Sequence, residues 1–136
     1  MSRYLAIIEE DAEQGVFFVS FPDAPGCIAS GATQDAALDD AVDALSEWVA
    51  DEIADGRTAP IPRSYSDLLK SGEYGLEKGG MVAWVPLLRE TGKLARANIS
   101  IDAGLLADID EAAGRHGVTR SAFLAAAARE KIKAGA

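Results

Sequence analysis

A strand pattern without a neighbouring strand limits the folds open to this chain. Over residues 96–102, polar and apolar residues alternate strictly, which is typical of a half-exposed strand. Only helical patterns follow, over residues 103–115 and from the capping residue Thr119 onward. The backbone groups of a single strand need a partner strand. The simplest partner is the same segment of a second chain, so we expect a two-fold homodimer built on a two-stranded ribbon and four helices.

The first 88 residues show the patterns of a small mixed domain. Apolar and β-branched runs predict strands over residues 4–8, 16–21, 27–30 and 81–88. A three-to-four periodicity predicts a long helix from an N-cap at Thr33 to a stop at Gly56. A shorter helix or turn is expected near residues 65–71. The protein is therefore expected to be α+β, with a βββαβ domain over residues 1–88, a linker over residues 89–93 and a β-α-α domain over residues 94–136.

Charge divides the chain in the same place. Residues 1–90 hold six basic and seventeen acidic side chains, a net charge of −11, whereas residues 91–136 hold seven basic and five acidic ones, a net charge of +2. This split indicates different partners for the two parts. One cysteine and one histidine exclude an internal disulfide and an ordinary zinc finger, and no metal or cofactor is expected. Without a long apolar run or a signal-peptide pattern, we expect a cytoplasmic protein with no membrane contact.

Motifs in the last third carry a resemblance to a known family. They are Arg96-Ala97-Asn98-Ile99-Ser100-Ile101, then Leu105, Leu106, Ile109 and Ala112, then Gly117-Val118-Thr119-Arg120-Ser121. This order of motifs resembles that of the Arc/MetJ-type ribbon-helix-helix repressors. The resemblance implies that Arg96, Asn98 and Ser100 contact DNA bases. It also implies that the start of the second helix, at Thr119, Arg120 and Ser121, contacts phosphate.

Both implied DNA roles are chemically sound. A two-stranded ribbon fits the major groove, and a helix N-terminus attracts anions. The alternative is a solvated strand face, with Arg120 a surface arginine that binds no ligand. The module length, the Thr-Arg-Ser helix start and the local positive charge favour DNA contact. Gly104 departs from the helix former usual at that position, so we expect a frayed first turn in that helix.

An acidic row follows the long predicted helix. Its members lie four residues apart: Asp35, Asp39, Asp43, Glu47, Asp51 and Asp55. Like charges at this spacing destabilise a helix, and no nearby Lys or Arg is expected to compensate. One interpretation is a solvated, solubilising surface. The other is a surface for a basic protein, because complementary charge favours fast and selective association.

Motifs in the amino-terminal part carry a second resemblance. They are Tyr4-Leu5-Ala6-Ile7-Ile8, then Phe-Pro-Asp-Ala-Pro-Gly-Cys at residues 21–27, the helix start Gly31-Ala32-Thr33, and Pro60-Ile61-Pro62. With the tail, they are similar to the HicB-type antitoxins over nearly the whole chain. The resemblance implies a partial ribonuclease H-like domain that binds and blocks a HicA-type toxin, a small basic messenger ribonuclease. It further implies that the tail dimer represses its own operon by binding operator DNA, with the toxin as co-repressor.

The residues expected to meet the toxin are Asp39, Asp43, Glu47 and Trp84. They combine the middle of the acidic row with an aromatic side chain. Trp48 and Trp84 are otherwise expected to pack in the core, Trp84 being the better candidate for an exposed anchor. Whether the amino-terminal domains also pair, which would give a tetramer, is left open.

No catalytic site is expected. A ribonuclease H-type nuclease needs several carboxylates converging on metal ions, and the first two strand patterns carry none in their middles. Cys27 has no local base and is expected to pack at a strand start, and His116 is expected to cap its helix. Two rivals remain: an orphan ribbon-helix-helix transcription regulator with a sensory or oligomerising amino-terminal domain, and a stand-alone nuclease.

Overall fold

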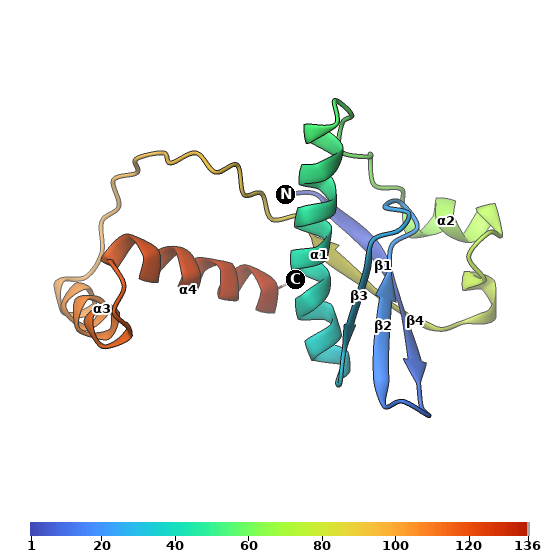
Figure 1. Ribbon diagram of the computed structural model, residues 1–136, viewed down its shortest axis with the longest axis horizontal. Coiled ribbons are helices and arrows are strands. Elements are labelled where there is room, and N and C mark those ends of the chain that lie inside the picture. The colour runs from blue at the N-terminus through green and yellow to red at the C-terminus, as the bar shows by residue number, and fades with distance from the viewer. Residues whose placement is uncertain (136) are drawn as a thin grey trace. The chain divides into compact units, whose positions relative to one another are not determined.

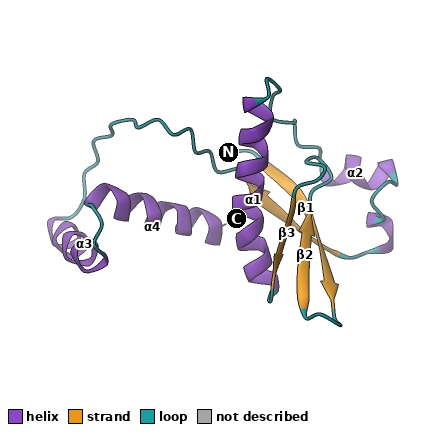
Figure 2. Cartoon of the chain, in the orientation of Figure 1, coloured by secondary structure: helices purple, strands orange, loops and turns teal. Residues whose placement is uncertain are grey.

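The computed structural model describes residues 1–135, which form two compact units. Met1–Glu90, here the amino-terminal unit, contains a sheet and helices, and Thr91–Gly135, here the tail unit, contains two helices (Figure 1, Figure 2). The protein is therefore α+β. Within residues 1–135, no helix is both long and apolar enough to cross a membrane.

The amino-terminal unit is built on a four-stranded antiparallel sheet. The strands are β1 (Arg3–Asp11), β2 (Val16–Ser20), β3 (Ile28–Gly31) and β4 (Met81–Pro86). Their order is β3-β2-β1-β4, so β3 and β4 are the edges. The helical elements are α1 (Gln34–Ala54), α2 (Tyr65–Ser71) and the 3-10 turn η1 (Leu76–Lys78). The predicted βββαβ order is confirmed, with α2 and η1 inserted before β4.

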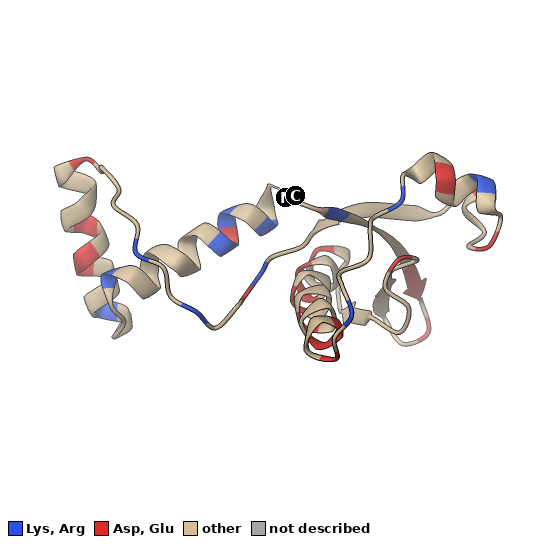
Figure 3. Ribbon diagram, turned by 90° about the horizontal axis from the view of Figure 1, so that it is seen from above, with Lys and Arg blue, Asp and Glu red and all other residues tan. Residues whose placement is uncertain are grey.

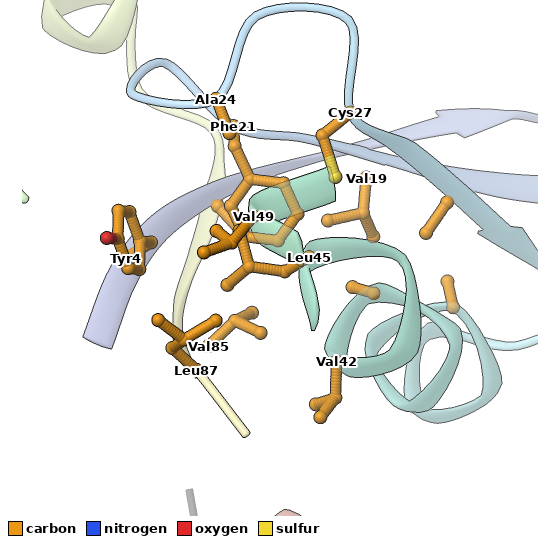
Figure 4. Close-up of a cluster of buried hydrophobic side chains, with 14 of the residues drawn as sticks. Tyr4, Val19, Phe21, Ala24, Cys27, Val42, Leu45, Val49, Val85 and Leu87 are labelled. Carbon is orange, nitrogen blue, oxygen red and sulfur yellow. The ribbon is translucent and has the colours of Figure 1, made fainter. Parts of the chain in front are cut away.

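The main core lies between one face of the sheet and α1. Side chains of a strand alternate between the two faces. Tyr4, Ala6 and Ile8 of β1 therefore point to the same side, where they pack with Leu45 and Val49 of α1. Figure 4 shows Tyr4, Leu45 and Val49 in this core. Burial of these apolar side chains is the main stabilising contribution to this unit.

The other face of the sheet, here called the outer face, is only partly covered. Leu5 of β1 is buried together with Leu68 of α2 and Leu76 of η1. The sheet consequently lies between α1 on one side and α2 on the other (Figure 1). Because α2 and η1 are short, they cover the region around Leu5 and leave other outer-face side chains exposed.

A close approach of β3 to α1 explains the Gly-Ala-Thr start of the long helix. A Cβ atom on Gly31 would lie 2.4 Å from the backbone nitrogen of Ala37, closer than real atoms come. Two residues later, the Thr33 hydroxyl accepts a hydrogen bond from the Ala36 backbone N–H at 3.0 Å. The predicted N-cap is confirmed.

Hydrogen bonds fasten the segment between α1 and α2 to the turn after β2. The Asp23 carboxylate, 7% exposed, accepts from the Arg63 backbone N–H at 2.8 Å and from Arg63 Nε at 2.6 Å. Arg63 Nη2 also donates to the Tyr74 hydroxyl at 3.1 Å. The Tyr4 hydroxyl donates to the Pro60 carbonyl at 2.5 Å. These contacts hold the irregular segment against the turn after β2 and the start of β1.

The tail unit contains α3 (Ala103–His116) and α4 (Arg120–Ala134). The expected fraying of the first turn of α3 is wrong. The Asp102 carboxylate accepts from the backbone N–H groups of Gly104 and Leu105 at 2.9 and 3.1 Å, which satisfies two donors at the helix start. At the other end, the helix stops at Gly117 with φ of 68°, and the His116 ring lies 6.2 Å from the Phe123 ring.

The strand predicted at residues 96–102 is not formed in the single chain. Between β4 and α3, the described chain has no strand. Ala97 and Ile99, two apolar positions of the alternating pattern, are exposed, with Ile99 66% exposed. The physical reason is that the described tail of the same chain offers no second strand with which this segment could form backbone hydrogen bonds.

Candidate functional site

The acidic row lies on the exposed side of α1 (Figure 3). Asp39, Asp43 and Glu47 are all exposed there, whereas Ala41 and Leu45 face the core. The helix N-cap at Thr33 fixes where α1 begins, and the apolar face then fixes its rotation. The carboxylates are therefore presented to solvent as a continuous acidic surface on one side of this unit.

The expectation that no basic residue compensates the row is wrong at its carboxyl end. After Gly56, the chain turns back and the Arg57 backbone N–H donates to the Glu52 carbonyl at 2.9 Å. The Arg57 guanidinium then bonds Glu52 at 2.6 and 2.9 Å and Asp55 at 3.2 Å. The hydrogen bond from Arg57 lowers the pKa of Glu52. The positive charge of Arg57 thus compensates the acidic side chains at the last turn of the helix.

Cys27 lies in the core beside the acidic helix. Its side chain is 4% exposed. Burial, together with the negative charges of Asp40 and Glu47, raises the pKa of the thiol to about 11. The thiol is therefore protonated at neutral pH, as expected for a packing residue and not for a nucleophile.

The two tryptophans lie in different environments. Trp48 is half-buried against the main core, and its Nε1 donates to the Pro25 carbonyl at 3.2 Å. Trp84 is 39% exposed, so its expected core position is wrong. In β4, Ala83 and Val85 point toward α1, and alternation sends Trp84 to the outer face, opposite Leu5 of β1.

The structure does not bring the four expected toxin contacts together. Asp39, Asp43 and Glu47 lie on α1, which covers one face of the sheet, and Trp84 lies on the other face. Around Trp84, sequence analysis missed three exposed apolar side chains of the same face: Phe18, Ile28 and Val82, which are 38%, 65% and 40% exposed. Strand alternation within β2, β3 and β4 was the signal that could have found them.

The expected DNA-contacting residues lie at two places in the tail unit. Arg96, Asn98 and Ser100 are exposed in the extended segment before α3. The start of α4 holds Thr119, whose hydroxyl accepts from the Ala122 backbone N–H at 3.1 Å, followed by the exposed Ser121.

Arg120 has a partner that sequence analysis missed. Its guanidinium bonds both carboxylate oxygens of Asp110, on α3, at 2.8 and 2.7 Å. This hydrogen bonding raises the pKa of Arg120 and lowers the pKa of Asp110. The bidentate contact joins the two helices of the tail and fixes where the guanidinium is presented.

Among residues 1–135, no group of three or more His, Cys, Asp or Glu side chains is arranged to hold a metal ion.

Comparisons with known proteins agree along almost the whole chain. Residues 4–128 match the model of a family described as HicB-like antitoxin of bacterial toxin–antitoxin system. A 14.9 kDa protein from the rep–hol intergenic region of Haemophilus phage HP1 (strain HP1c1) is 30% identical over 118 residues, 85% of this chain and 88% of the relative.

Solved structures show the same similarity. The crystal structure of the Burkholderia pseudomallei antitoxin HicB is 29% identical, with 97% of this chain and 99% of that chain covered and a TM-score of 0.56. A chain of a HicA3 and HicB3 toxin–antitoxin complex shares the fold at 23% identity, over 63% of this chain and 98% of its own length, with a TM-score of 0.51. Because the family match spans most of the sequence, this protein belongs to the HicB-like antitoxin family of bacterial toxin–antitoxin systems.

Proposed function

We propose that this antitoxin neutralises a HicA-type toxin, a small basic messenger ribonuclease, by binding it directly in the cytoplasm. The observation that carries the proposal is the net charge of −11 over residues 1–90, which is complementary to a basic partner. Family membership supports the same partner class. Inhibition then needs no catalysis by the antitoxin, because occupying the RNA-binding surface of the toxin is sufficient.

The acidic row on α1 is proposed to attract the toxin. Carboxylates such as Asp39, Asp43 and Glu47 compete with RNA phosphates for basic side chains. Charge of this kind increases association rates and makes them sensitive to salt. Trp84 is proposed as an apolar contact on the opposite face of the sheet.

Expression of the native locus tests this function. The chain is expected to co-purify with a small basic protein encoded beside it, and that protein is expected to arrest growth when expressed alone. If no partner co-purifies while the chain still binds DNA, the neutralising role is refuted. The amino-terminal unit would then be a sensory or oligomerising domain of an orphan regulator.

Charge reversal tests the acidic row. Reversal of Asp39, Asp43 and Glu47 to Lys is expected to slow toxin association and weaken its salt dependence. A control with the same change in net charge reverses Asp108, Glu111 and Glu130, which lie on α3 and α4 of the tail unit. The control is expected to slow association less. Unchanged affinity and salt dependence in the α1 variant would refute the role of the row.

The tail unit is proposed to form a ribbon-helix-helix homodimer that represses its own operon. Residues 94–101 would pair with the same segment of a second chain, which would cover Leu94 and Ile99, 104% and 66% exposed in the single chain. Arg96, Asn98 and Ser100 would then face the major groove. Thr119, Arg120 and Ser121 would hold phosphate at the start of α4, and bound toxin would act as co-repressor.

Substitutions separate dimerisation from DNA contact. Ile99→Lys is expected to give a monomer that has lost operator binding, whereas Arg96→Ala is expected to stay dimeric and lose sequence preference. Lys131→Ala, near the other end of α4, is the control and is expected to bind nearly as wild type. Mass measurement of each sample also distinguishes a dimer from a tetramer. A monomeric wild-type chain that binds operator DNA would refute the ribbon.

A further inference from the structure

A row of mainly apolar side chains crosses the outer face of the sheet. Ile28 of β3 lies opposite Ser20 of β2, Ser20 lies opposite Ile7 of β1, and Ile7 lies opposite Val82 of β4. The row is apolar at three of its four positions, and the exposed Ser20 separates Ile28 from Ile7. Its two ends, Ile28 and Val82, are 65% and 40% exposed.

Two aromatic side chains extend this row. Phe18 stands two residues from Ser20 on β2, and Trp84 stands two residues from Val82 on β4, so both share the outer face. They are 38% and 39% exposed. We use the name outer patch for Phe18, Ile28, Val82 and Trp84. Large exposed apolar side chains gathered on one face mark interaction sites more often than plain surface.

The charge of the amino-terminal unit indicates which kind of partner can cover the outer patch. Glu9 lies directly opposite Phe18 on the same face and is exposed. With a net charge of −11 over residues 1–90, the unit repels a second copy of itself and nucleic acid alike. A partner that covers the patch must therefore combine apolar surface with positive charge, which describes a basic protein.

The geometry points to the outer patch, and not the acidic row of α1, as the surface on which the basic toxin packs. This inference rests on the neutralising function proposed above. The α1 row lies on the other side of the sheet and lacks large exposed apolar groups in its middle turns, where Ala41, Leu45 and Val49 face the core. The row attracts the toxin from a distance, and the outer patch holds it.

The two surfaces therefore act on different rate constants. Long-range charge changes the association rate, whereas desolvated contacts at the centre of an interface change the dissociation rate. Aromatic side chains dominate such centres, and Trp84 is the aromatic residue of the patch with the largest side chain.

The experiment measures toxin association and dissociation separately for full-length variants. The probe is the basic protein that co-purifies with the chain. Trp84→Ala is expected to raise the dissociation rate by about thirtyfold or more, the range of an interface hot spot. The paired substitutions Ile28→Thr and Val82→Thr keep β-branched side chains, which suit a strand, and are expected to raise it by about tenfold.

Two comparisons make the result specific. Ile53→Thr, at an isoleucine 58% exposed on α1, makes a matching change on the other side of the sheet and is expected to leave dissociation unchanged. Neutralising Asp39, Asp43 and Glu47 to Asn or Gln is expected to slow association alone. Far-ultraviolet circular dichroism and thermal melting identify any variant that has not folded, and the Thr variants remain informative if Trp84→Ala has not.

Three outcomes would overturn the inference. If the α1 variants speed dissociation and the patch variants do not, the toxin packs on α1 and the neutralising function still stands. If the patch variants change the mass of the free antitoxin and leave toxin dissociation unaltered, a second copy occupies the patch. If wild-type antitoxin captures no basic protein, the proposed function fails first, and the inference fails with it.

Discussion

Cys27 shows how one residue takes its chemistry from two layers of the fold. The sheet and α1 bury the thiol, and the carboxylates of α1 add negative charge, which together raise its pKa from an ordinary 9.0 to about 11. Because the folded thiol loses its proton at a higher pH than the unfolded thiol does, this group stabilises the fold below about pH 9. That contribution is lost as the pH rises toward 11.

Alkylation tests the environment of Cys27. At pH 8, iodoacetamide is expected to modify the native protein about a hundredfold more slowly than the protein in concentrated urea, because both thiolate fraction and access are reduced. Rates are measured by mass spectrometry, with Cys27→Ser as the unlabelled control. Equal rates in the two conditions would mean that the thiol is not enclosed.

Asp23 is the residue on which the irregular segment before α2 depends. Its nearly buried carboxylate accepts two hydrogen bonds from Arg63. Asp23→Ala is expected to lower the free energy of unfolding by about 2 kcal/mol, since a backbone N–H and a guanidinium lose their acceptor. Urea denaturation measures the change. Glu13→Ala, in the exposed hairpin, is the control, and a similar loss there would contradict the assignment to Asp23.

The element with the tightest steric requirement is the joint between β3 and α1. Gly31→Ala is expected to lower the free energy of unfolding of the amino-terminal unit by about 1–3 kcal/mol, because the added methyl would press on the backbone of α1 at Ala36 and Ala37. Chemical denaturation measures the loss. Ser30→Ala, at the exposed neighbouring residue, is expected to change stability much less, and equal effects would show that the joint can relax.

Local patterns predicted the elements of the fold well. The N-caps at Thr33 and Thr119 and the stop at Gly56 each depend on residues close in sequence. The face on which Trp84 lies was not predicted, because β4 belongs to an apolar run in which no polar residue marks the outer side. Which face α2 covers is decided by tertiary packing alone.

The candidate sites were predicted less completely, for a related reason. Asp110 and Arg120 are ten residues apart and meet only because α3 and α4 turn back on each other. Likewise, Arg57 reaches Glu52 only after the helix closes at Gly56. Neither pair follows a helix or strand period, so the sequence contains no signal for them.

At the scale of the whole molecule, the two units have different sources of stability. Residues 1–90 enclose a core between a sheet and α1. In the tail unit, only Ile109 and Ala113 are buried apolar residues among those described. A unit with so little core of its own depends on what covers its remaining apolar surface.

Two melting transitions are therefore expected from the full chain. The midpoint of the tail transition should rise by several degrees between about 1 and 100 µM protein, because mass action stabilises a dimer, while the midpoint of the amino-terminal transition should stay constant. Differential scanning calorimetry at several concentrations measures both. Ile99→Lys should abolish the concentration dependence of the tail midpoint. A wild-type tail midpoint that does not change with protein concentration would contradict dimerisation through this unit.

The unpaired segment at residues 94–101 has a consequence for genetics. If two chains must each supply one strand of the ribbon, every substitution in the segment occurs twice in a dimer of two mutant chains. It occurs once in a dimer of one mutant and one wild-type chain. A chain that folds and pairs normally but lacks Arg96 would form mixed dimers with wild-type chains. These mixed dimers would no longer recognise the operator. Such an allele would act dominantly over the intact gene, whereas an allele that cannot pair, such as Ile99→Lys, would be recessive.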